Sequence, residues 1–113
     1  MISHSPLAEA DVSQEIKEFS RALVNGTIKN KDEIDRNIQK YAPAYPVEQL
    51  AIIDRNILRL AIFEILFDNR VPIKVAVNEA VELAKAFGSG SSAKFINGVL
   101  GSVSVIADRQ NTR

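Results

Sequence analysis

The sequence contains no cysteine and no tryptophan, and its only histidine is His4. The absence of cysteine excludes disulfide bonds, thiolate metal sites and a thiol nucleophile, and it is typical of proteins in a reducing compartment. No run of about 18 apolar residues occurs, and no basic segment precedes an apolar one near residue 1, so neither a membrane span nor a signal peptide is predicted. We therefore expect a cytoplasmic protein without a metal site.

An excess of charge of one sign is also lacking. The 14 Lys and Arg residues balance 14 Asp and Glu residues, so the formal net charge is +0 and the isoelectric point is about 6.6. A chain without net positive charge has no overall field that attracts nucleic acid. Any contact with RNA or DNA must therefore come from a local group of cations.

Groups that could carry out catalysis are scarce. The chain has no histidine beyond residue 4, and the motifs HExxH, GxGxxG and GxxxxGK[ST] are absent. Glu79 and Glu82 lie three residues apart on one predicted helix face. They could form an acid–base pair or half a metal site, or, with Lys74 and Lys85 nearby, a solvated charged face. We favour the solvated face, and we expect no enzyme activity, no catalytic residue and no cofactor.

The residues that are present favour one helical domain. The chain has 113 residues, of which 46% are hydrophobic and 25% charged, enough for a single domain with its own core. Apolar residues recur at the helical spacings of three and four, for example at Val12, Ile16, Phe19 and Leu23. The sequence predicts a tail at residues 1–10, a helical domain at residues 11–108 and a tail at residues 109–113, with helices to about residue 28 and over residues 30–41, 47–67, 72–87 and 92–108.

Residues at the expected helix ends support this division. Asn30 is a candidate N-cap, Pro46 and Pro72 suit first helical positions, and Gly88 suits a left-handed residue that ends a helix. The segment 47–67 is apolar on more than one face, which is typical of a central, buried helix. Short connections favour antiparallel neighbours, so we predict an all-α bundle of about five helices.

Two arginines on the predicted central helix are candidates for binding phosphate or a partner carboxylate. Arg55 and Arg59 lie four residues apart and so project to similar sides of the helix. Pairing within the chain, for instance with Asp54 or Glu64, is the interpretation that we favour.

Lys94 and Phe95, at the start of the last predicted helix, form a second candidate site. A helix N-terminus with hydroxyls, a cation and an aromatic ring offers backbone donors, charge and a stacking surface to single-stranded nucleic acid. The helical periodicity by itself favours a core position for Phe95.

The segment from Asp54 to Val103 resembles the C-terminal half of the NusB family of bacterial transcription antitermination factors. The pieces that carry the resemblance are ILRLAIFE, VPIKVAVNEAVELAK and KFINGVL, in that order and spacing. A weaker similarity reaches back to about Phe19. The resemblance implies an all-α fold of two small helical subdomains, no catalysis and a role in transcription.

The resemblance also implies partners. Proteins of this family pair with the small-subunit ribosomal protein that doubles as NusE, and the pair binds the boxA element of nascent RNA. RNA polymerase, together with other Nus factors, is thereby kept from terminating prematurely, notably on ribosomal RNA operons.

Particular residues match family positions. The acidic positions that contact the partner protein correspond to Glu48 and Asp54, and the RNA-facing positions correspond to Ser91, Lys94 and Phe95. Ser91 departs from the acidic residue often found at its position. Two further residues resemble signature residues of the family, and we interpret them as buried amides that tie helices together: Asn78 and Asn97.

The beginning of the chain departs from the family pattern. An arginine-rich amphipathic helix of the RRxARExALQxLY type is absent before Val12, which is explained by truncation, an internal start or a naturally shortened homologue. Apolar surface around Ile16, Phe19 and Leu23 is then expected to be uncovered, which predicts a homodimer or a swapped N-terminal helix. The alternative function is a protein-interaction module that docks or sequesters the ribosomal-protein partner without binding RNA, and it gains support if the cations are scattered or paired internally.

Overall fold

The computed structural model describes the backbone of residues 6–68 and 70–111 and the side chains of residues 12–68 and 70–109. His4 lies outside the described residues. The described chain is helical and contains no strand within these ranges, which confirms the all-α prediction. The elements are α1 (Pro6–Lys29), α2 (Lys31–Tyr41), the short 3-10 turn η1 (Val47–Gln49), α3 (Ile52–Leu66), α4 (Ile73–Phe87) and α5 (Ser92–Asn111).

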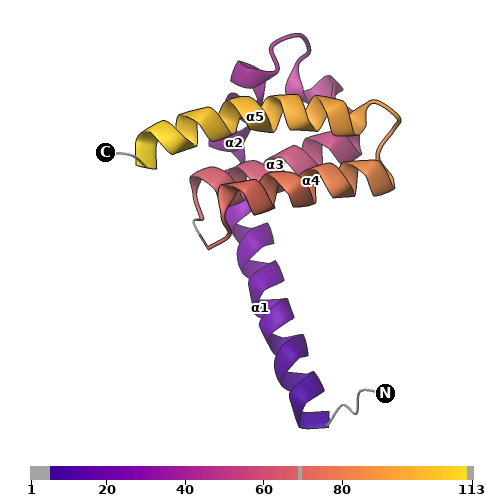
Figure 1. The fold of residues 1–113 in the computed structure, drawn as a ribbon, viewed down its shortest axis with the longest axis vertical. Coiled ribbons are helices and arrows are strands. Elements are labelled where there is room, and N and C mark those ends of the chain that lie inside the picture. Colours follow the sequence, from indigo (N-terminus) through magenta and orange to yellow (C-terminus); the bar gives the residue numbers. More distant parts are fainter. Residues whose placement is uncertain (1–5, 69, 112–113) are drawn as a thin grey trace.

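Helices α3, α4 and α5 form the body of the molecule. They run side by side with successive helices antiparallel, and each contacts the other two, while α2 packs on α3 and α5 (Figure 1). The core lies between these four helices because each turns its most apolar face toward the others. Its fully buried large side chains are Ile34, Ile38, Leu58, Ile62, Ile96, Leu100 and Val103.

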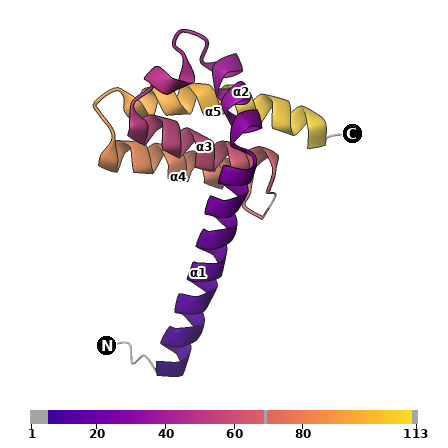
Figure 2. The same cartoon turned by 180° about the vertical axis from the view of Figure 1, so that it is seen from behind.

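Helix α1 projects away from this body. Figures 1 and 2 show it leaving the bundle at a steep angle, and it contacts α2 and α3 through its C-terminal part. The radius of gyration is therefore 15.7 Å, whereas a compact domain of this length has about 13 Å. The helix begins at Pro6 and α5 continues to Asn111, so helical backbone extends into both segments that we expected to be tails.

The predicted helix over residues 47–67 is wrong at its start. Leu50 and Ala51 are extended, with ψ of 148° and 138°, so η1 is separated from α3. Pro46 is extended as well and precedes the short turn rather than opening the long helix. The N–H of Val47 donates to Gln39 Oε1 of α2 at 3.3 Å, a tertiary contact that a local pattern does not contain.

Gly88 does not adopt the left-handed conformation that we predicted. Its φ and ψ are −90° and −171°, which is extended backbone. A Cβ atom at this position would lie 2.5 Å from both Cβ and Oγ of Ser92. Glycine suits this position because it has no side chain that would collide with Ser92 where the chain folds back. The buried Ser92 Oγ accepts a hydrogen bond from the Ser89 N–H at 2.9 Å.

Gly26 allows α1 to approach α3 closely. A Cβ atom on Gly26 would lie 2.2 Å from Cζ of Phe63, so the ring of Phe63 occupies the space where a side chain would stand. Asn30 follows at the α1–α2 junction and occupies the N-cap position of α2 as predicted. Its side chain does not cap α2, however, because Nδ2 donates to the Gly26 carbonyl oxygen at 2.8 Å.

Candidate nucleic-acid interface

The three predicted RNA-facing residues lie together at one hollow. Ser91, Lys94 and Phe95 come from the start of α5, and the end of α2 supplies the opposite side of the hollow. Its volume is about 470 Å³. The lining residues are Tyr41, Ala42, Ser91, Lys94, Phe95, Gly98 and Val99.

The hollow combines aromatic rings with cations. Phe95 is half-buried, so it packs against the core and also lines the hollow, which reconciles the two interpretations of this residue. Lys94 is exposed and forms no ion pair with the part of the chain that the structure describes. Lys40 Nζ lies 5.4 Å from the ring centre of Tyr41, a cation–π distance.

Tyr41 is the residue that the sequence did not reveal as part of this site. It lies far from Phe95 in the chain, and its spacing from Ile34 and Ile38 indicated only a core-facing helix position. Packing of α2 against α5 brings it to the hollow.

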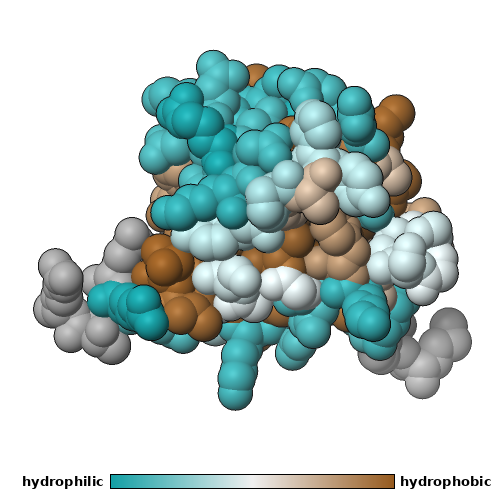
Figure 3. Space-filling model, turned by 90° about the horizontal axis from the view of Figure 1, so that it is seen from above, coloured by the Kyte–Doolittle hydropathy of each residue, from teal (hydrophilic) through white to brown (hydrophobic). Residues whose placement is uncertain are grey.

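Viewed from the end of the molecule opposite the tip of α1, the surface is mostly hydrophilic, with hydrophobic residues showing between polar ones (Figure 3).

The two arginines of α3 do not add to this site. Arg59 donates from Nε and Nη2 to the two carboxylate oxygens of Asp35 at 2.8 and 2.9 Å. Pairing within the chain is thus confirmed, but the partner is Asp35 of α2 and neither of the two acids that we named. Arg55 Nη1 donates to the carbonyl oxygen of Glu48 at 3.2 Å. The cations are therefore held internally instead of forming one basic patch with Lys94.

The predicted partner-binding acids lie at the start of α3. Glu48 is exposed on η1, and its backbone is tied to the first turns of α3 by the hydrogen bond from Arg55. Asp54 is half-buried in the first turn, and its Oδ1 is buried and accepts no hydrogen bond from the described residues. Both carboxylates thus belong to one end of the central helix, with acceptor capacity left over.

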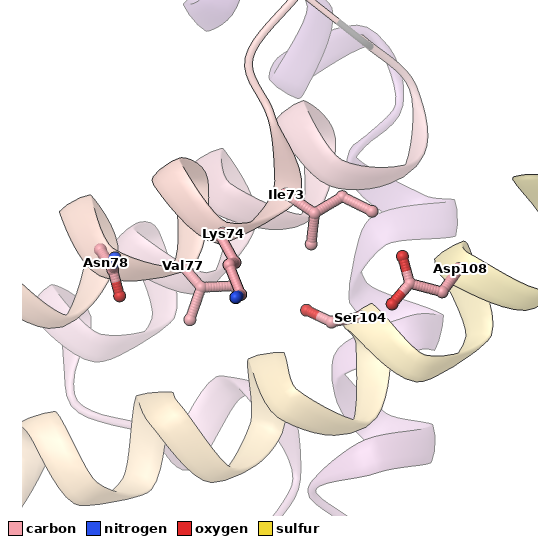
Figure 4. Close-up of a pocket in the computed structure, with 6 residues that line it drawn as sticks. All are labelled: Ile73, Lys74, Val77, Asn78, Ser104 and Asp108. Atoms are coloured by element: carbon pink, nitrogen blue, oxygen red, sulfur yellow. The ribbon is translucent and has the colours of Figure 1, made fainter.

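The predicted buried amides are wrong: Asn78 and Asn97 are both exposed. Asn78 points outward because Ala76, Ala80 and Ala84 form the buried face of α4. Asn97 points outward because the buried face of α5 is formed by other residues, Ile96, Val99, Leu100 and Val103. Asn78 borders a hollow of about 430 Å³ between α4 and α5 (Figure 4). This hollow contains none of the predicted site residues, and its Ser104 hydroxyl already donates to the Leu100 carbonyl oxygen at 2.7 Å.

Glu79 and Glu82 lie on an exposed face of α4, as we favoured. Glu82 pairs with Lys85 at 3.2 Å, and both side chains are largely exposed. Among the described residues, no three His, Cys, Asp or Glu side chains converge as a metal site requires. None of the helices in the described ranges is long and apolar enough to cross a membrane.

One carboxyl group has an unusual environment. Glu64 lies beside a small apolar groove between α1, α3 and α4, which Phe19, Leu60 and Leu83 also line. Burial of the Glu64 side chain raises the pKa of its carboxyl above the ordinary value, and the negative charges of Glu79 and Asp68 raise it further. The ionised carboxylate is therefore a mild cost to the folded chain.

Glu64→Gln is expected to stabilise the protein at neutral pH by less than about 1 kcal/mol, because the group is only partly buried. The folded chain holds the Glu64 proton more tightly than the unfolded chain does. Stability is therefore lost as the pH rises from the ordinary pKa of 4.5 through the raised one, and the gain from glutamine should vanish below that window. Denaturant unfolding at pH 4 and pH 7 measures the difference. The exposed Glu82→Gln is the control, and an equal effect of Glu64→Gln at both pH values would contradict the assignment.

Comparison with known proteins gives a consistent result. The model of the NusB family matches residues 2–105. Transcription antitermination proteins NusB from two strains of Dehalococcoides mccartyi, CBDB1 and ATCC BAA-2266, are each 59% identical over 108 residues, which cover 95% of this chain and 76% of each relative. The corresponding protein of Chloroflexus aggregans is 48% identical over 99 residues, 86% of this chain and 66% of that protein.

A solved structure of T. maritima NusB matches the fold. The TM-score is 0.76 at 39% sequence identity, and the match covers 80% of this chain and 63% of that one. Sequence and fold thus agree, and the class of protein that they indicate is a non-enzymatic transcription factor. The chain belongs to the NusB family of transcription antitermination proteins.

Proposed function

We propose that this chain binds boxA-type RNA together with the small-subunit ribosomal protein NusE. In this role it prevents premature termination by RNA polymerase, with other Nus factors, notably on ribosomal RNA operons in the cytoplasm. Membership in the NusB family supports the proposal. The observation that carries it is the convergence of Ser91, Lys94 and Phe95 at one hollow.

The chemistry of the hollow suits a single strand of RNA. Two aromatic rings, Tyr41 and Phe95, offer surfaces on which bases stack, and each stacked base contributes about 1–3 kcal/mol. Lys94 and Lys40 supply positive charge for phosphates. The first turn of α5 adds backbone N–H groups at the positive end of a helix.

A second candidate function is a module that docks or sequesters NusE without reading RNA. The observation that favours it is the internal engagement of Arg59 with Asp35 and of Arg55 with Glu48. Phosphate neutralisation supplies much of the affinity for RNA, so a site with few free cations binds weakly. Glu48 and Asp54 would serve both functions equally.

A titration separates the two functions. Labelled boxA-type RNA and a scrambled RNA are each titrated with the chain, with and without NusE, at two salt concentrations. Selective binding that depends on NusE supports the antitermination role. Binding of NusE without selectivity between the two RNAs supports the docking module instead.

Substitutions at the hollow test the assignment of its residues. Lys94→Gln is expected to weaken binding of both RNAs and to lower the salt dependence by about one counterion, because it removes one phosphate contact. Phe95→Leu keeps the apolar packing but removes the ring, and it should weaken binding by about 5-fold to 100-fold. Lys85→Gln is the control, because Lys85 is an exposed lysine of α4 that does not line the hollow. Unchanged binding by both variants at the hollow would refute this site.

A further inference from the structure

Asn78 and Asn97 have no contact that explains them within the described chain. Both side chains are exposed, and neither forms a hydrogen bond with the residues that the structure describes. Asparagine is also less favourable in a helix than most residues, so helix stability does not account for them. Each amide carries two donor hydrogens and an acceptor oxygen. The hydrogen-bonding capacity of both side chains is therefore available to a partner.

The two asparagines belong to one surface, which we name the α4–α5 seam. On α5, spacings of four, three and four place three further residues on the side of Asn97, and on α4 spacings of four and three do the same for Asn78. Helices α4 and α5 pack on each other and are antiparallel (Figure 1). The α4–α5 seam consists of Lys74, Asn78 and Val81 of α4 and Asn97, Gly101, Ser104 and Asp108 of α5.

The hollow of about 430 Å³ between α4 and α5 lies at one end of the seam. Figure 4 shows Lys74 and Ser104 pointing into the space between the two helices from opposite sides. In the same view, Asn78 lies toward one end of the hollow and Asp108 toward the other. The hollow also has an apolar part, which the half-buried Ile73 and Val77 supply.

The charges at this hollow are unpaired and of opposite sign. Lys74 and Asp108 are exposed, and neither forms an ion pair with the described residues. Ser104 Oγ donates its hydrogen to the Leu100 carbonyl oxygen, so it offers only lone pairs to a ligand. Ser104 and Asp108 therefore attract a basic group, whereas Lys74 attracts an acidic one. Such a site matches a ligand that carries both charges, and its carboxylate repels the uniformly negative backbone of a nucleic acid.

The spacing of the two amides suits an extended polypeptide. Asn78 and Ser104 line the same hollow, and Asn97 lies seven residues from Ser104. Seven residues of helix correspond to about 10 Å, which is the length of about three residues of an extended chain. Each amide can donate to a peptide carbonyl oxygen and accept from a peptide N–H. Gly101 lies between the amides, and a Cβ there would meet no other atom within 4 Å, so a backbone has room to approach the helix.

We infer that the α4–α5 seam binds an extended segment of a partner protein. The backbone of that segment hydrogen-bonds to Asn78 and Asn97, one of its acidic side chains pairs with Lys74, and one of its basic side chains pairs with Asp108. Side chains on one face of an extended chain are two positions apart, so the acid and the base are expected at that spacing. The seam shares no residue with the candidate RNA hollow or with the acids at the start of α3, so the inference does not depend on RNA binding or on NusE.

Two synthetic peptides of eight residues and identical composition test the inference. The first carries glutamate and lysine two positions apart, on one face of an extended chain, and the second carries them adjacent, on opposite faces. In an NMR titration of the isotope-labelled protein, the first peptide is expected to shift the signals of Lys74, Asn78 and Ser104, with a dissociation constant below about 1 mM. The second should bind about twofold to fivefold more weakly, because one of the two charge pairs is lost.

A pair of asparagine variants tests the amide contacts. Asn78→Ala should weaken binding of the first peptide about threefold to tenfold, because one peptide unit loses its partner. Asn25→Ala is the matched control, since Asn25 is an exposed asparagine within α1 and outside the seam. Circular dichroism of each variant verifies that the helices are intact. Equal effects of the two substitutions, equal affinity for the two peptides, or no shift at about 5 mM peptide would overturn the inference.

The same spectra distinguish a peptide from other occupants of the seam. Neither boxA-type RNA nor about tenfold dilution of the protein is expected to move the signals of Lys74, Asn78 and Asn97. Movement of these signals with RNA would make the seam part of an RNA site. Movement on dilution would show a second copy of the chain on the seam. Either result would overturn the assignment of this surface to a partner protein.

Discussion

Gly26→Ala is expected to lower the free energy of unfolding by up to about 2 kcal/mol, although alanine favours a helix by about 1 kcal/mol over glycine. The reason is the ring of Phe63, whose Cζ atom would lie 2.2 Å from the new methyl group. Overpacking of this kind costs about 1–3 kcal/mol, and the ring, 8% exposed, has little room to move. Chemical denaturation followed by circular dichroism measures the change.

Gly101→Ala is the control for this substitution. Gly101 also lies within a helix, α5, but a Cβ atom there would have no other atom within 4 Å. Alanine at this position should therefore stabilise the protein by about 0.5–1 kcal/mol. Combining Gly26→Ala with Phe63→Leu should recover part of the lost stability, because the smaller side chain makes room for the methyl group. Stabilisation by Gly26→Ala alone would show that α1 does not rest on Phe63.

Asp54→Arg is expected to weaken binding of NusE by at least about 30-fold, if Asp54 pairs with a cation of that partner as we propose. Reversing a charge that a partner buries costs about 2–5 kcal/mol, most of it from the unpaired group left behind. Asp54 is suited to such a contact because its side chain is only half-buried and forms no ion pair with the described residues. Calorimetric titration of NusE with each variant measures the effect.

A matched acid distinguishes a specific contact from a general effect of charge. Asp32 is exposed in the first turn of α2, and the half-buried Asp54 lies in the first turn of α3, so both acids are at the positive end of a helix. Asp32→Arg should therefore cost similar helix stability but leave NusE affinity unchanged. Glu48→Arg should weaken NusE binding in the same direction as Asp54→Arg. Equal losses from Asp32→Arg and Asp54→Arg would remove Asp54 from the interface.

Local sequence patterns were sufficient to predict the helices and the class of protein. Apolar spacings of three and four identified the helices that became α2, α4 and α5, because the buried face of a helix is set by residues one turn apart. The same spacings identified the apolar face of α1 that carries Val12, Ile16, Phe19 and Leu23. Missing catalytic groups and the motifs between Asp54 and Val103 were enough to predict a non-enzymatic NusB protein.

Contacts between distant segments were decided by the tertiary structure. Arg59 pairs with Asp35, 24 residues away, instead of with an acid on its own helix, because packing of α2 on α3 brings that carboxylate within 2.8 Å. Tyr41 joins Phe95 at the hollow for the same kind of reason. The sequence did not indicate that Leu50 and Ala51 separate η1 from α3, since both residue types are favourable in a helix. Periodicity reports which residues share a face, but it carries no information about which segment comes to lie against that face.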